Sequence, residues 1–214
     1  MKRVGIMGGT FDPIHMGHLD VARASADVLH LDTVRLMPSN IPPHRDSPGT
    51  SAFHRFALVA LAAAIDARFE ADDMELRREG PSYAADTLRE LQRQGFEARE
   101  IFFLTGSDAF AEIATWKDYP ALLELAHFVV CSRPGKPAEM VRGLLPDLRD
   151  RMVDAREFRQ AAAAQVILLD AATADVASST VRAALAGGAA VDGMLPGPVL
   201  AHIRRHGLYN SRIH

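Results

Sequence analysis

The sequence is poor in cysteine, in long apolar segments and in charge of one sign. Cys131 is the only cysteine among 214 residues, which excludes an internal disulfide and a cysteine-based zinc site. No segment approaches the roughly 20 apolar residues of a membrane span, and Lys2 and Arg3 precede a strand-like run rather than the apolar core of a signal peptide. The net charge of −3 gives no overall attraction to nucleic acid or to an anionic membrane. We therefore expect a cytoplasmic protein that binds neither, and any anion site must be local.

Hydrophobic residues make up 48% of the chain, enough for one proper core, and we expect a single domain over residues 1–214. Short apolar runs alternate with helical patterns, which predicts an α/β protein with a Rossmann-like, doubly wound parallel sheet. The expected strands are Val4–Met7, Val34–Met37, Ile101–Thr105, Phe128–Cys131 and Val166–Leu169. The expected helices are Gly17–Leu29, Ala52–Asp66, Tyr83–Gln94 and Leu122–Ala126, with a peripheral helix within Asp150–Gln165 and another that begins at Ser178.

The first strand is followed by Gly8-Gly9-Thr10-Phe11-Asp12-Pro13 and then by a His-x-Gly-His. Glycines allow the backbone to approach a ligand closely, and the start of the next helix adds free N–H groups and positive potential. His15 and His18 are three residues apart, so both fall on one face of that helix near its N-terminus. The pattern predicts a phosphate site that is neither a Walker loop nor a Gly-x-Gly-x-x-Gly turn.

Other polar residues follow the later strands, where ligands bind in an open parallel sheet. Asn40, His44 and Arg45 follow the second strand, Gly106 and Asp108 the third, and Arg133 the fourth. Arg182 falls in the first turn of the helix that begins at Ser178, where a cation is mildly unfavourable unless a polyphosphate is bound. Each has an ordinary explanation as well: Asp108 suits a helix N-cap, and Arg133 or Arg182 could be a solvated charge.

These motifs together resemble the bacterial nicotinate-nucleotide adenylyltransferases of the nucleotidyltransferase α/β superfamily, and the match spans nearly the whole chain. The family's glycine-rich motif is present in full at Gly8–Leu19. The further matches are Pro42-Pro43-His44-Arg45, Pro81-Ser82-Tyr83 with Thr87-Leu88, Gly106-x-Asp108, Thr115-Trp116, Ser132-Arg133-Pro134-Gly135 and Ser178-Ser179-Thr180-Val181-Arg182. Two residues depart from the pattern: Ala177 replaces a larger hydrophobic residue, and Lys117 stands where an aromatic residue is common.

The resemblance implies transfer of AMP from ATP to nicotinate mononucleotide, which gives deamido-NAD and pyrophosphate in NAD biosynthesis. It implies catalytic roles for His15, His18 and Arg182, and Mg²⁺ held mainly through the ATP phosphates rather than by a protein metal site. The ATP-binding residues would be Gly8, Gly9, Thr10, Phe11, Gly106, Asp108, Ser178, Ser179 and Thr180. The mononucleotide would meet Asn40, His44, Arg45, Tyr83, Thr87, Trp116 and Arg133, with Trp116 stacked on the pyridine ring.

Three alternatives remain. A phosphopantetheine adenylyltransferase shares the first motif, but that family is shorter and would not need the Pro-Ser-Tyr and Trp116 segments. A catalytically silent nucleotide sensor would not need His15, His18 and Arg182 together. An RNA-linked role is weakened by the chain length and the acidic balance. The sequence leaves the oligomeric state open, and it is compatible with a homo-oligomer.

Overall fold

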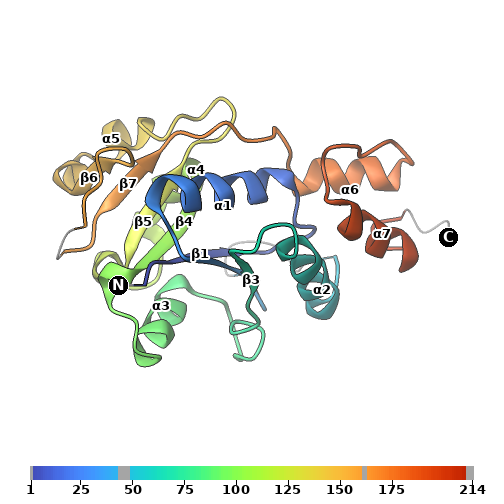
Figure 1. Ribbon diagram of the computed structural model, residues 1–214, viewed down its shortest axis with the longest axis horizontal. Coiled ribbons are helices and arrows are strands. Elements are labelled where there is room, and N and C mark those ends of the chain that lie inside the picture. The colour runs from blue at the N-terminus through green and yellow to red at the C-terminus, as the bar shows by residue number, and fades with distance from the viewer. Residues whose placement is uncertain (1, 43–48, 161–162, 211–214) are drawn as a thin grey trace.

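The centre of the molecule is a seven-stranded sheet in the order β3-β2-β1-β4-β5-β7-β6 (Figure 1). It comes from a computed structural model that describes residues 2–42, 49–160 and 163–210. All the strand pairings are parallel. The strands are β1 (Val4–Gly9), β2 (Thr33–Pro38), β3 (Phe69–Ala71), β4 (Ile101–Gly106), β5 (His127–Cys131), β6 (Met152–Asp154) and β7 (Val166–Leu169).

Helices cover both faces of this sheet. They are α1 (Met16–Leu29), α2 (Ala52–Ala63), α3 (Ala84–Arg93), α4 (Ser107–Ala111), α5 (Met140–Leu144), α6 (Ser178–Ala186) and α7 (Gly197–Arg205). Short 3-10 helices occur at Ala98–Glu100, Ile113–Thr115, Ala121–Glu124 and Pro146–Arg151.

Two hydrophobic cores lie on opposite faces of the sheet. Alternate residues of one strand point to opposite faces, so Phe102 and Leu104 of β4 enter one core while Ile101 and Phe103 enter the other. The first core is completed by α1, α2, α6 and α7, and the second by α3, α4 and α5. Figure 1 shows the two layers as α1 and α3 on either side of β1.

The five expected strands and the parallel α/β class are confirmed. Both strands that the sequence did not reveal, β3 and β6, are three residues long and lie at the two edges of the sheet. The expected helix at Leu122–Ala126 is wrong, because Ala121–Glu124 forms a single 3-10 turn. The expected helix within Asp150–Gln165 is also wrong for its described residues: Asp150 and Arg151 end a 3-10 helix, and Met152–Asp154 pair with β7 as β6. Phe158 then packs edge-on against Phe102 at 5.8 Å between ring centroids.

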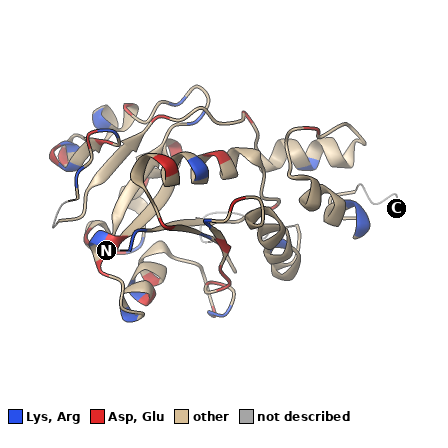
Figure 2. Ribbon diagram, viewed as in Figure 1, with Lys and Arg blue, Asp and Glu red and all other residues tan. Residues whose placement is uncertain are grey.

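The strand order fixes where a ligand can bind. β1 pairs with β2 on one side and with β4 on the other, so the chain reverses its direction of winding there and leaves a crevice beyond the carboxyl ends of these strands. Figure 2 shows acidic and basic residues interspersed along the helices and loops, while the strands carry few charges. No helix in the described ranges is both long enough and apolar enough to span a membrane.

Candidate active site

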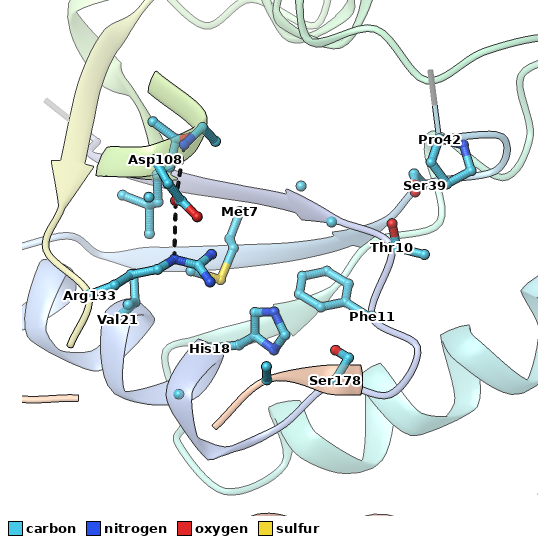
Figure 3. A pocket seen from close by; sticks show the side chains of 18 of the residues that line it. Met7, Thr10, Phe11, His18, Val21, Ser39, Pro42, Asp108, Arg133 and Ser178 are labelled. Atoms are coloured by element: carbon cyan, nitrogen blue, oxygen red, sulfur yellow. Dashed lines mark hydrogen bonds and ion pairs between the residues drawn. The ribbon is translucent and has the colours of Figure 1, made fainter. Parts of the chain in front are cut away.

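The glycine-rich turn places both histidines at the start of α1. His15 is the N-cap residue, and its backbone N–H donates to Nδ1 of His18 at 3.3 Å. The two rings are stacked with centroids 3.7 Å apart and an angle of 30° between their planes. His18 also meets Phe11 edge-on at 5.1 Å between ring centroids, and Figure 3 shows the two side chains next to each other in the cleft. The start of α1 therefore places two imidazole rings side by side next to the glycine-rich turn.

The glycine of the His-x-Gly-His has a steric reason. A Cβ at Gly17 would lie 3.0 Å from the carbonyl oxygen of Ala174 and 3.3 Å from Nδ1 of His15. Any larger residue would push the first turn of α1 away from the segment before α6. Gly17 therefore lets this turn and the His15 ring fit beside the loop that leads into α6.

His15 is 3% exposed, and this burial lowers the pKa of its imidazole to about 4, with a further lowering from the positive charge of Arg133. The ring is neutral at pH 7. Its Nδ1 atom is buried and has no hydrogen-bond partner among the described residues. A buried polar atom without a partner costs free energy, and an added anion near this ring would favour its protonated form.

The start of α6 is attached to the same turn. Ser178 Oγ donates to the carbonyl oxygen of Pro13 at 2.9 Å, and Arg182 Nη1 donates to that of Asp12 at 2.7 Å. The guanidinium of Arg182 is thus brought to the glycine-rich turn from 170 residues further along the chain. Positive charge and free helix N–H groups meet there, which suits a polyphosphate.

The ends of β4 and β5 carry an ion pair on the opposite side of the cleft. Arg133 Nε and Asp108 Oδ1 lie 3.4 Å apart, as the dashed line in Figure 3 marks. A Cβ at Gly106 would come within 2.6 Å of Arg133 Nε and of Asp108 Oδ1, so a larger residue there would displace the pair from its position above the end of β4. Asp108 and Arg133 therefore lie next to each other on the same side of the cleft.

A buried arginine that the sequence reading missed holds the turn to the next loop. Arg55 of α2 is 1% exposed and donates to the carbonyl oxygens of Thr10 at 2.8 Å and Ser39 at 2.7 Å. It also donates to those of Thr50 and Asn40, each at 3.3 Å. Burial lowers its pKa, and the nearby carboxylate of Asp12 opposes that effect. The sequence signal was a cation on a largely apolar helix.

Asp12 is a second such anchor. Its carboxylate accepts from Tyr209 Oη at 2.7 Å and from the backbone N–H of Gly49 at 3.1 Å. Tyr209 follows α7, so the end of the described chain is tied to the turn after β1. The burial of Tyr209 raises the pKa of its phenol, which keeps the hydroxyl protonated as a donor.

A further side of the cleft contains Trp116, which is half-buried and meets Phe103 edge-on at 6.0 Å between ring centroids. Its neighbour Lys117 lies over the Tyr83 ring, with Nζ 4.9 Å from the ring centroid. An indole and a phenol ring thus line this side together with a cation.

Two of the expected substrate-binding residues, Thr87 and Asn40, bond to other protein groups and do not line the cleft. The buried Thr87 donates from Oγ1 to Glu75 Oε1 at 2.6 Å, and Asn40 Nδ2 donates to the carbonyl oxygen of Arg78 at 3.0 Å. Burial raises the pKa of Glu75. The side chains of Asn40 and Thr87 therefore connect the loops around the cleft instead of lining it.

The cleft has a volume of about 1040 Å³. Most of the expected site residues line it: Gly8, Gly9, Thr10, Phe11, His15, His18, Tyr83, Gly106, Asp108, Trp116, Arg133, Ser178 and Arg182. Ser179 and Thr180 are exposed and do not line it, because the helix turns them away from the Ser178 face. His44 and Arg45 lie outside the described residues. Lys117, Glu75 and Asp12 also line the cleft, although the sequence did not assign them to it.

Comparisons with known proteins show the family and the fold. A family model described as cytidylyltransferase-like matches residues 6–184. A probable nicotinate-nucleotide adenylyltransferase of Chromobacterium violaceum is 43% identical over 210 residues, covering 97% of this chain and 98% of that protein. Another, from Cronobacter sakazakii, is 40% identical over 207 residues, covering 94% and 93%. The solved structure of Plasmodium falciparum nicotinic acid mononucleotide adenylyltransferase complexed with NaAD superimposes with a TM-score of 0.77 at 16% identity over the full length of both chains, which shows a shared fold.

Proposed function

Because the chain belongs to the cytidylyltransferase-like family and, within it, to the nicotinate-nucleotide adenylyltransferases, we propose that it transfers the adenylyl group of ATP to nicotinate mononucleotide. The products are deamido-NAD and pyrophosphate, in NAD biosynthesis. The observation that carries this proposal is the 43% identity over almost the full length of a relative with that name. The cleft supports it, because it brings His15, His18 and Arg182 to one glycine-rich turn.

The proposed reaction is one in-line displacement. An oxygen of the 5′-phosphate of the mononucleotide attacks the α-phosphorus of ATP, and the bond from that phosphorus to the oxygen bridging to the β-phosphorus breaks. The electron pair leaves with pyrophosphate. A phosphate monoester is already largely ionised near pH 7, so catalysis consists mainly of positioning and charge stabilisation.

The phosphates would lie along the glycine-rich turn. The rings of His15 and His18 are stacked against each other at the start of α1, so both can donate to the α- and β-phosphate oxygens as charge develops. Gly8, Gly9, Thr10 and Phe11 supply the backbone of the turn. Arg182 and Ser178, the first residue of α6, would hold the departing pyrophosphate, whereas Ser179 and Thr180 lie outside the cleft. The position of Ser178 and Arg182 on the turn supports this assignment.

The two nucleosides would occupy the two sides of the cleft. Gly106 and Asp108 would contact adenosine, with the cation of Arg133 facing a phosphate of the mononucleotide. Trp116 and Tyr83 would bind the pyridine ring, which their place on one wall supports. We further propose that His44 and Arg45 contact the mononucleotide, while Asn40 and Thr87 act on it indirectly by holding the loops.

We propose that Mg²⁺ enters with ATP. Asp12 has both carboxylate oxygens in hydrogen bonds, and Asp108 is paired with Arg133, so these two carboxylates already have protein partners. Within the described ranges no three His, Cys, Asp or Glu side chains are grouped so as to hold a metal ion. These donors fit an ion that is held through phosphate oxygens and water, and that neutralises phosphate charge when bound.

Pyrophosphate release tests the proposal. ATP and Mg²⁺ are supplied with nicotinate mononucleotide, nicotinamide mononucleotide or phosphopantetheine in parallel. Release with the nicotinate substrate supports the proposal, and release with phosphopantetheine alone would replace it with the other adenylyltransferase activity. ATP binding without release from any acceptor would identify a nucleotide sensor instead.

We assign no nucleic-acid partner to the chain, because its charges are mixed and its net charge is −3. Filter binding to RNA at moderate salt checks this assignment.

A further inference from the structure

An ion pair with Asp86 holds the side chain of Lys117, which lines the cleft. Its ammonium donates to both carboxylate oxygens of Asp86, each at 2.9 Å, and stands over the ring of Tyr83. Lys117 lines the cleft beside Trp116, whereas Asp86 lines a separate surface depression together with Arg89. Lys117 is therefore the member of the Lys117–Asp86 pair that reaches the cleft, while Asp86 lies at the separate depression.

The acid behind Lys117 is shared with other charges. Arg89 lies 3.8 Å from Asp86 and 2.5 Å from Asp118. Two cations and two carboxylates thus form one group, and Lys117 is the member that lines the cleft. Glu75, which also lines the cleft, is buried and accepts a hydrogen bond from Thr87, and burial raises the pKa of its carboxyl group.

We propose that Lys117 is a specificity-determining residue that favours a pyridine nucleotide bearing a carboxylate over one bearing a carboxamide. The inference rests on the proposed function and assigns a selective group within that site. A ring held against Trp116 and Tyr83 would direct its substituent along the wall that carries the ammonium. A carboxylate gains Coulomb attraction from this charge, and a neutral carboxamide does not.

The effect must be moderate. The Lys117 side chain is 39% exposed, so solvent screens its field, and exposed ion pairs contribute little. We expect a preference of about fivefold in kcat/KM from this charge. The ion pair with Asp86 limits the entropy lost on binding, because it already holds the long side chain in place.

The test measures kcat/KM for nicotinate mononucleotide and for nicotinamide mononucleotide with the full chain. Lys117→Gln removes the charge and keeps much of the side-chain length. We expect the nicotinate value to fall about fivefold, the nicotinamide value to stay the same, and Lys117→Arg to retain most of the preference. High salt should reduce the preference of the unmodified protein and have little effect on that of Lys117→Gln.

Arg89→Gln is the matched control, because it removes one positive charge from the same group without touching the cleft. We expect it to keep the substrate ratio of the unmodified protein. An equal loss of preference in both variants would overturn the proposal in favour of a general field effect. An unchanged ratio in Lys117→Gln, or equal losses on both substrates, would show that the Lys117–Asp86 pair is only structural.

The failure of this inference differs from the failure of the proposed function. If the unmodified protein releases no pyrophosphate with either pyridine nucleotide, the proposed function is wrong, and the proposed role of Lys117 is wrong as well. If it uses nicotinate mononucleotide and Lys117→Gln keeps the same ratio, only the role of Lys117 is wrong.

Discussion

The buried imidazole of His15 makes the stability of the protein sensitive to acid. Burial, with a further contribution from Arg133, lowers the pKa of His15 in the folded chain to about 4. An unfolded chain restores the ordinary histidine value of about 6.5. Between these two values the unfolded state binds more protons than the folded state, so the free energy of unfolding falls as the pH falls through this window.

Replacement of His15 by Asn removes this titration. Over the range from pH 7 to pH 5, protonation of His15 in the unfolded chain should cost the unmodified protein about 2 kcal/mol of stability. The variant has no titrating group at this position, so it does not lose this part of the stability, and all its other titrating groups are unchanged. The stability of the unmodified protein relative to His15→Asn should therefore decrease by about 2 kcal/mol between pH 7 and pH 5.

Urea unfolding of both proteins at several pH values from 5 to 8 measures this difference directly. The buried His127 offers a matched comparison away from the phosphate turn, because burial lowers its pKa to about 4 as well. His127→Asn should show the same change in relative stability and keep its turnover, whereas His15→Asn should lose turnover. Parallel stability curves for the unmodified protein and His15→Asn would refute the reasoning, because His15 would then titrate alike in both states.

Three further substitutions test the other parts of the site. His18→Ala should lower turnover by about 10² to 10³ through the loss of a donor to the developing charge, with ATP affinity much less affected; a change within a few-fold would remove His18 from the chemistry. Trp116→Ala should raise the KM for nicotinate mononucleotide about tenfold and leave that for ATP unchanged, and an unaltered KM would return Trp116 to a packing role. Tyr209→Phe removes a donor to the Asp12 carboxylate and should lower the free energy of unfolding in urea by about 1.5–3 kcal/mol, whereas unchanged stability would mean that water replaces the hydroxyl.

The sequence predicted the sheet well because each main strand is a short apolar run bounded by glycine, proline or polar residues. The edge strand β6 was taken for part of a helix because three residues are too few to show the period of a strand. The site was predictable for a related reason. The carboxyl ends of parallel strands meet at one edge, so Asp108 and Arg133, each just after such a run, were expected in one site and lie 3.4 Å apart.

Side-chain direction was not predictable in the same way. Tyr83 and Thr87 are one helical turn apart, and the sequence placed both in the pocket. Tyr83 lines the cleft, while Thr87 is buried and donates to Glu75, because the carboxylate brought in by the preceding segment needs a donor there. Lys117 is the opposite case: a departure from the family pattern proves to line the cleft, where the carboxylate of Asp86 on another element holds it.

The residues that the sequence could not reveal are those that hold the glycine-rich turn in shape. Arg55 binds the carbonyl oxygens of four residues on two loops, and Asp12 is bonded by Tyr209 from 197 residues away. A glycine-rich turn has little conformational preference of its own, so its shape must be imposed by such contacts. Catalysis by positioning requires a turn that stays fixed while charge develops on the phosphates. In the proposed reaction, the buried arginine and the tied carboxylate would therefore serve catalysis as well as stability, although neither side chain needs to touch a reacting atom.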